Sequence, residues 1–139
     1  MADLFENHGF NSGGMLHLTP REALEFCSKG AILLDVREEY LNAFKKFDVQ
    51  NVIYMPLRTF DTEVLHLPAD KYLIIADSAG LKSKEATKIL LEKGFTNIAN
   101  LAGGLVEWER DGLPLIQDKK ERLSGSCMCQ LKPREKKSK

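Results

Sequence analysis

The sequence has few cysteines and no long apolar segment. Its three cysteines, Cys27, Cys127 and Cys129, are an odd number and too few for a disulfide framework, so they favour a reducing compartment. No apolar run approaches the roughly 18 residues that a transmembrane helix needs. The acidic segment 1–6 lacks the basic and apolar regions of a signal peptide. We therefore expect a cytoplasmic protein that does not bind membranes.

Metal-site spacings and nucleic-acid-binding features are also missing. His8, His17 and His66 show no metal spacing, so we predict neither a metal nor a cofactor. The segment 117–139 carries eight basic and three acidic residues, a net charge of +5 that leaves −5 on residues 1–116. This basic segment has no aromatic residue that could stack on bases, which argues against nucleic-acid binding. We interpret it as a solvated, partly disordered tail.

The length and composition indicate one globular domain with tails. The chain has 139 residues, of which 43% are hydrophobic and 29% charged, which is ordinary for a globular protein. We predict a loose N-terminal lead-in over 1–15, a domain over 16–116, and the basic tail over 117–139. The number of copies in the working protein is left open.

Short apolar runs alternate with helical patterns through the predicted domain. Thr19, Pro20 and Glu22 form a capping box that starts a helix, and Gly30 ends it. Further helices are predicted over 39–45, within 57–67, from Ser83 to Lys93, and over a last segment that Gly103-Gly104 opens and Asp111 ends. Strands are predicted over 16–18, 31–34, 52–55, 72–76 and 97–101. This alternation indicates the α/β class, with a parallel sheet covered by helices on both faces.

The loop after the run 72–76 is the strongest candidate site. Its residues are Asp77, Ser78, Ala79, Gly80, Leu81 and Lys82. A strand that leads through a short loop into a helix brings several free backbone N–H groups to one point. Such a loop can bind an anion or hold an activated nucleophile.

An ordered set of short motifs resembles a single-domain rhodanese over about residues 16–116. The motifs are Asp35-Val36-Arg37-Glu38, Met55-Pro56-Leu57, Leu67-Pro68, the loop ending in Gly80-Leu81-Lys82-Ser83, Leu101-Ala102-Gly103-Gly104-Leu105, Trp108, and Gly112-Leu113-Pro114. The resemblance implies one domain with a parallel central sheet of about five strands and helices on both faces. It also implies transfer of a sulfane sulfur from a donor such as thiosulfate to a thiophilic acceptor. In this family a cysteine at the start of the loop carries the persulfide, and a basic residue often ends the loop.

The chain departs from the family pattern at the reacting position. The cysteine position matches Asp77, and the closing basic position matches Lys82. The chain departs a second time where the family has a Gly-His-Ile-Pro-Gly-Ala run. Its residues 47–52 there are Phe-Asp-Val-Gln-Asn-Val. An aspartate oxygen lacks the polarizability of a thiolate that attacks sulfur and leaves again. Its negative charge also repels an anionic donor.

We therefore interpret this loop as inactive in sulfur transfer, in a protein that acts as a binding or regulatory module. In this interpretation the Asp77 carboxylate caps the following helix at Ser83 together with the loop amides. Asp35 and Arg37 tie the end of their strand to neighbouring backbone, or Arg37 lies on the rim of the loop and meets an anion. The partner is an unidentified protein or a small sulfur-containing molecule. Cys27 and Trp108 are predicted core residues.

Two enzymatic alternatives stay open. Cys127 and Cys129 form a Cys-x-Cys pair in a basic, glycine-containing segment, where nearby cations favour the thiolate. They could serve as a sulfur carrier, as a redox pair, or as half of a soft-metal site. Asp77 could instead be the nucleophile of an aspartyl phosphatase. That chemistry usually recruits Mg²⁺ through further carboxylates, and only Asp35 is a plausible neighbour.

Overall fold

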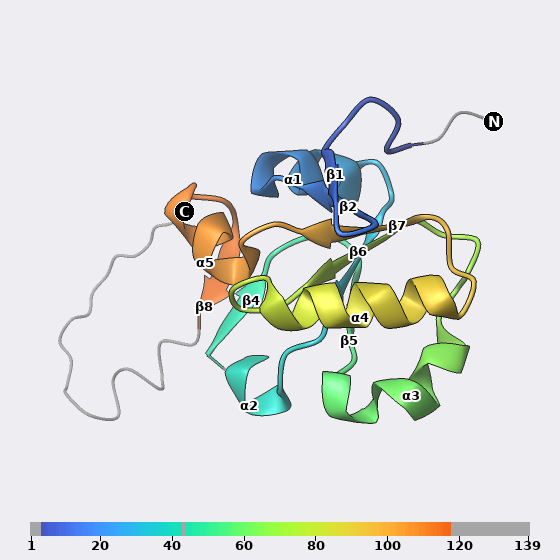
Figure 1. Ribbon diagram of the computed structural model, residues 1–139. Helices are drawn as coiled ribbons and strands as arrows, with labels where there is room; N and C mark the ends of the chain where they lie inside the picture. Colours follow the sequence, from blue (N-terminus) through green and yellow to red (C-terminus); the bar gives the residue numbers. More distant parts are fainter. Residues whose placement is uncertain (1–3, 43, 118–139) are drawn as a thin grey trace, which may run out of the picture.

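The fold is built on a six-stranded mixed sheet whose strand order is β1-β2-β7-β6-β3-β5. The computed structural model describes residues 4–42 and 44–117 (Figure 1). The pairings β2–β7, β7–β6, β6–β3 and β3–β5 are parallel, and β1 is antiparallel to β2. The strands are β1 (Phe10–Ser12), β2 (Met15–Leu18), β3 (Ile32–Asp35), β5 (Val52–Tyr54), β6 (Leu73–Ala76) and β7 (Ile98–Leu101). The predicted α/β class, with about five parallel strands, is confirmed.

Helices cover both faces of this sheet, as predicted. They are α1 (Pro20–Ser28), α2 (Glu39–Asn42), α3 (Phe60–Glu63), α4 (Leu81–Glu92) and α5 (Gly104–Arg110), with 3-10 turns η1 (Leu57–Thr59) and η2 (Val64–His66). Side chains of α1 and α5 pack on one face, and side chains of α3 and α4 pack on the other. None of these helices has both the length and the apolar character to cross a membrane.

The central strand β6 shows why the sheet is buried on both sides. Its four residues are fully buried and alternate between the two faces. Ile74 and Ala76 belong to the cluster under α1 and α5, whereas Leu73 and Ile75 belong to the cluster under α4. A continuous apolar run is therefore what the strand requires. Asp77 follows in the alternation that places Ile75 on the α4 side.

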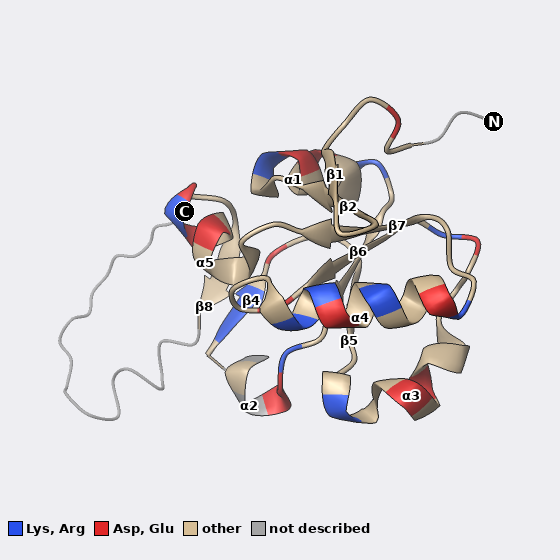
Figure 2. Ribbon diagram, in the orientation of Figure 1, with Lys and Arg blue, Asp and Glu red and all other residues tan. Residues whose placement is uncertain are grey.

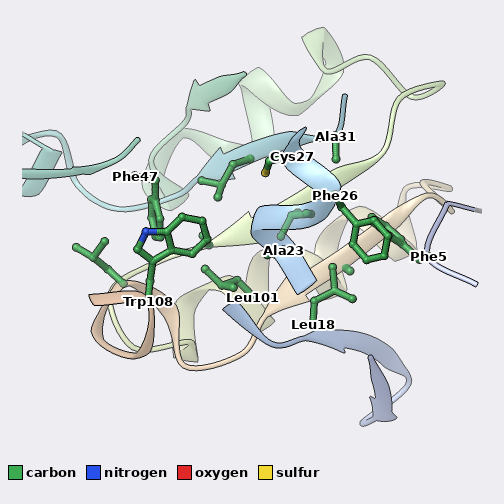
Figure 3. Packing of buried hydrophobic residues seen from close by; sticks show 14 residues of the cluster. Phe5, Leu18, Ala23, Phe26, Cys27, Ala31, Phe47, Leu101 and Trp108 are labelled. Atoms are coloured by element: carbon green, nitrogen blue, oxygen red, sulfur yellow. The ribbon is translucent and has the colours of Figure 1, made fainter. Parts of the chain in front are cut away.

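Aromatic side chains fill the cluster under α1 and α5 (Figure 3). Trp108 has no exposed surface, its ring centroid lies 5.1 Å from that of Phe47, and its indole N–H donates to the Pro114 carbonyl at 2.8 Å. Cys27 is 1% exposed in the same cluster. The predictions of core positions for Trp108 and Cys27 are confirmed.

The N-terminal segment differs from the predicted lead-in over 1–15. Residues 10–12 form β1, and Phe5 lies buried against Phe26 with ring centroids 5.1 Å apart. His17, which is buried, contacts the Ser12 carbonyl through Nε2 at 3.0 Å. Its Nδ1 lies 3.0 Å from the amide nitrogen of Asn100, whose amide oxygen has no hydrogen-bond partner. These long-range contacts attach the segment to the sheet, and local composition does not reveal them.

A second, two-stranded sheet was also missed. The helix predicted over 39–45 ends at Asn42, and β4 (Lys45–Phe47) pairs antiparallel with β8 (Leu115–Gln117). Neither strand is longer than three residues. Such short strands form because β4 packs Phe47 against Trp108 and Lys45 binds Glu109 of α5 at 2.7 Å. Tertiary contacts override the helical pattern here.

The predicted capping box at Thr19 is confirmed. The Thr19 hydroxyl oxygen accepts from the Glu22 backbone N–H at 3.2 Å, and the Glu22 carboxylate accepts from the Thr19 backbone N–H at 2.9 Å. The helix predicted from Ser83 starts two residues earlier, since α4 begins at Leu81.

Candidate functional site at the loop between β6 and α4

The candidate loop lies at the carboxyl edge of the parallel strands. β6 is paired on one side with β3 and on the other with β7. Asp77 therefore follows the strand that lies between β3, which ends in Asp35, and β7, which leads to Gly103 and Gly104. In open α/β sheets, ligands bind at this edge.

The Asp77 carboxylate points into its own loop and is 4% exposed. One oxygen, Oδ1, accepts from the Gly80 backbone N–H and from the Ser83 hydroxyl, the latter at 3.3 Å. The other, Oδ2, accepts from the Lys82 backbone N–H at 2.7 Å. These are the contacts that the capping interpretation requires. Both oxygens are occupied, so the donors that a bound anion would use already hold a carboxylate.

The start of α5 is bonded to the same loop. The Leu105 and Val106 backbone N–H groups donate to the carbonyls of Asp77 and Ser78, each at 2.9 Å. Gly104 makes this approach possible: its φ is +59°, and a Cβ there would lie 2.5 Å from the Asp77 carbonyl oxygen. A side chain at Gly104 would therefore push the start of α5 away from the Asp77 loop. The sequence analysis missed this role of Gly104, although the Gly103-Gly104 pair signals a tight backbone approach.

The remaining loop residues are placed differently from one another. Gly80 precedes the first residue of α4 and has φ +96°, a backbone conformation that is strained for any residue with a side chain. Ala79 is exposed, and Leu81 is 73% exposed. Lys82 contributes its backbone N–H to Asp77, while its exposed ammonium group forms no ion pair within the described part of the chain. The loop amides, rather than the Lys82 side chain, hold the carboxylate.

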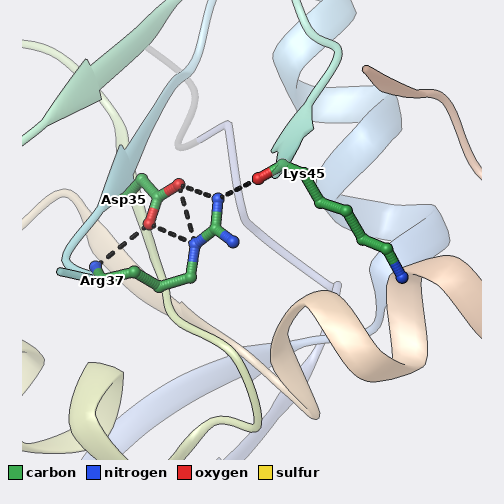
Figure 4. Close-up of polar contacts among 3 residues, drawn as sticks. All are labelled: Asp35, Arg37 and Lys45. Atoms are coloured by element: carbon green, nitrogen blue, oxygen red, sulfur yellow. Dashed lines mark hydrogen bonds and ion pairs between the residues drawn. The ribbon is translucent and has the colours of Figure 1, made fainter. Parts of the chain in front are cut away.

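Asp35 and Arg37 form a buried ion pair beside the loop (Figure 4). Arg37 Nη2 lies 2.8 Å from Asp35 Oδ2 and donates to the Lys45 carbonyl at 2.8 Å. The guanidinium also lies 5.5 Å from the centroid of the Phe47 ring. Asp35 has no exposed surface and Arg37 is 3% exposed. Arg37 is therefore not a rim residue open to an anion, but ties β3 to β4.

Burial shifts the pKa values of two further side chains, Tyr54 and Cys27. Desolvation, reinforced by the Asp35 charge, raises the pKa of Tyr54 at the end of β5. Burial raises the pKa of the Cys27 thiol to about 12. Cys27 is thus a neutral thiol at physiological pH and a poor nucleophile.

The described residues 4–42 and 44–117 contain no group of three side chains suited to a metal ion. Asp77 and Asp35, the carboxylates considered for Mg²⁺, are engaged by backbone donors and by Arg37. Cys127 and Cys129, the candidate tail thiols, lie outside the described residues.

Comparison with known proteins places this geometry in a family. Residues 19–111 match the rhodanese-like domain. The chain is 26% identical to a sulfurtransferase of Allochromatium vinosum over 68 residues, which are 49% of this chain and 64% of that protein. It is 28% identical to thiosulfate sulfurtransferase GlpE of Haemophilus influenzae over 105 residues, covering 70% of this chain and 91% of that protein.

The structural comparison agrees. A rhodanese-related protein from Thermoplasma volcanium superposes with a TM-score of 0.66 at 25% identity, covering 73% of this chain and 98% of that one. The family match spans more than half of the chain and includes the loop, the Asp35–Arg37 pair and the start of α5. The chain belongs to the rhodanese-like domain family.

Proposed function

We propose that this protein is a binding or regulatory module whose loop does not transfer sulfur. The observation that carries the proposal is the buried Asp77 carboxylate, which accepts hydrogen bonds from Gly80, Lys82 and Ser83. The order of the motifs along the sequence supports a match between Asp77 and the position of the family's cysteine.

The chemistry of the loop supports this proposal in two ways. A carboxylate oxygen cannot form a persulfide and release it, because sulfur exchange needs a thiolate as nucleophile and leaving group. In addition, the Asp77 carboxylate accepts hydrogen bonds from the Gly80 and Lys82 N–H groups and the Ser83 hydroxyl, so these groups are not free to bind thiosulfate. The loop therefore lacks both the reacting sulfur atom and free hydrogen-bond donors for thiosulfate.

A thiosulfate:cyanide assay on matched variants tests the proposal. The double variant C127S/C129S, which keeps the loop but has no tail thiol, is expected to form thiocyanate no faster than buffer alone. Adding D77C to this background is expected to create turnover, because the thiol enters an otherwise conforming loop. Turnover by C127S/C129S itself would show the proposal to be wrong.

The second candidate function uses the tail thiols Cys127 and Cys129 for sulfur or redox transfer. It is supported by the relatives named as sulfurtransferases. It is also supported by the position of Gln117, which pairs with Lys45 of β4, because the Lys45 carbonyl binds Arg37 and the tail therefore begins close to the Asp35–Arg37 pair. Incubation with a persulfide donor followed by mass spectrometry should then show added sulfur on the tail. An unmodified tail, or wild-type turnover equal to that of C127S/C129S, would contradict this function.

The contacts of Asp77 weigh against the aspartyl-phosphatase alternative. A nucleophilic carboxylate must present a free oxygen to phosphorus, whereas both Asp77 oxygens accept hydrogen bonds within a buried loop. Absence of aryl phosphate hydrolysis in the presence of Mg²⁺ would remove this alternative. We further propose a cytoplasmic, reducing location, which the free thiol of Cys27 supports.

A further inference from the structure

Three apolar side chains stand exposed over the closed loop. Ala79 is exposed, Leu81 is 73% exposed, and Val106 is 51% exposed. The backbones that carry them touch: Val106 N–H donates to the Ser78 carbonyl, and a Cβ on Gly80 would lie 3.1 Å from the Gly103 nitrogen. We call Ala79, Leu81 and Val106 the apolar rim. It lies where the loop amides are already occupied by Asp77, so this surface suits an uncharged segment rather than an anion.

The tail contains one segment of matching chemistry. Residues 123–131, Leu-Ser-Gly-Ser-Cys-Met-Cys-Gln-Leu, carry no charge, although the tail around them is strongly basic. Leu123, Met128 and Leu131 supply apolar side chains, and the two thiols lie between them. An uncharged segment can also pass Lys82 and Lys84, which are exposed on the first turn of α4, without repulsion.

The tail begins close enough to reach the rim. The described chain ends at Gln117, which pairs with Lys45 of β4. Lys45 is bonded through its carbonyl to Arg37, and its ammonium binds Glu109 of α5. β8 therefore ends near the last turn of α5, the helix whose first turn carries Val106 (Figure 1). Cys127 is ten residues beyond Gln117, so an extended connection spans at most about 35 Å.

We propose that residues 123–131 dock on the apolar rim and present Cys127 and Cys129 beside the Asp77 loop. The inference rests on the proposed function, in which Asp77 occupies the loop N–H groups. A loop that bound an external anion would offer a different surface. The opposite net charges of tail and body, +5 and −5, favour the association. Glu85 is exposed on α4 and forms no ion pair in the described part of the chain, so it is available to the basic residues that flank the segment. Figure 2 shows that acidic and basic positions both occur along α4.

Disulfide trapping in the full chain tests the docking directly. The variant L81C/C129S carries one thiol on the rim and one, Cys127, on the tail. Equilibration with reduced and oxidised glutathione measures the effective concentration of the two thiols. Cys27 does not interfere, because burial raises the pKa of its thiol to about 12 and removes it from exchange. Independence of the protein concentration identifies the bond as intramolecular.

A matched control separates docking from mere proximity. Adding M128E and L131E keeps the tail length and both thiols but places charge on the segment that should dock. A tethered but undocked thiol has an effective concentration in the range of about 1 mM. We expect L81C/C129S to exceed this control at least about ten-fold, and V106C/C129S to behave alike.

Equal effective concentrations with and without M128E/L131E would overturn the proposal, because proximity alone would then account for trapping. That result is distinct from failure of the proposed function, which would appear as thiocyanate formation by C127S/C129S. Loss of trapping in 1 M salt would identify the charge difference between tail and body as a main source of the docking energy.

Discussion

Asp35 and Asp77 are two buried carboxylates at the carboxyl ends of neighbouring parallel strands, yet different kinds of group stabilise them. Asp35 is paired with the guanidinium of Arg37, at 2.8 Å between Oδ2 and Nη2. Asp77 is held by the Gly80 and Lys82 backbone N–H groups and by the Ser83 hydroxyl. The first arrangement needs a specific partner side chain, and the second needs a specific backbone path. The loop at Asp77 thus binds its own carboxylate mainly through backbone N–H groups, in place of a cationic side chain.

The ion pair should be the more sensitive of the two sites. Arg37→Ala leaves the Asp35 carboxylate buried without a cation and also releases the Lys45 carbonyl. We expect a loss of about 3–5 kcal/mol in the free energy of unfolding, measured by urea denaturation. Arg37→Met, which removes the charge but keeps more of the volume over Phe47, should lose a similar amount. A loss below about 1 kcal/mol would mean that water solvates Asp35 readily.

The backbone path at Asp77 can be broken from the other side, at Gly104. A methyl group there meets the Asp77 carbonyl at 2.5 Å, in addition to the strain at φ +59°. Gly94→Ala is the matched control, because Gly94 has φ +95° and no atom within 4 Å of the new Cβ. We expect both variants to lose the 1–3 kcal/mol or so that left-handed strain costs, and Gly104→Ala to lose more. Equal losses in thermal unfolding would show that the α5 start moves away without cost.

Removing the Asp77 carboxylate should cost less than breaking the ion pair. Asp77→Ala leaves two backbone N–H groups and the Ser83 hydroxyl without their acceptor. Loss of such a cap typically costs about 0.5–2 kcal/mol. Asp77→Asn keeps one acceptor oxygen and should lie between the wild type and Asp77→Ala in urea denaturation. If Asp77→Ala were more stable than the wild type, the carboxylate would be a strained feature rather than a cap.

Glu22 is a third carboxylate, held by backbone N–H groups like Asp77 but nearer the surface. Burial raises its pKa, but hydrogen bonds from the Thr19 and Gly9 N–H groups outweigh this, so the pKa is lowered overall. Its contribution is therefore present above the ordinary glutamate range and is lost as the pH falls through the lowered pKa. Glu22→Gln should flatten this acid limb of the stability curve and cost about 0.5–1 kcal/mol at neutral pH. An unchanged acid limb would contradict this assignment.

Local sequence patterns predicted the parts of the fold that local physics controls. The capping box at Thr19, the buried run of β6 and the loop that follows it were all placed correctly, apart from the two-residue shift at the start of α4. The strands β1, β4 and β8 were not predicted. Each is only three residues long and forms through pairing with another strand, so its own sequence carries no strand pattern. The sequence left open whether Arg37 ties its strand to neighbouring backbone or lies on the rim, because the acceptor that decides between them is the Lys45 carbonyl of β4.

The amino-acid sequence by itself therefore determined the α/β class, the position of the loop, and the presence of a carboxylate rather than a thiol at its start. These follow from strand burial, helix capping and side-chain chemistry, which act within a few residues. Only the tertiary structure decided where that carboxylate points, that Arg37 is withdrawn from the rim, and that Gly104 brings the start of α5 against the loop. Each of these depends on contacts between distant segments, which form when the two faces of the sheet are packed.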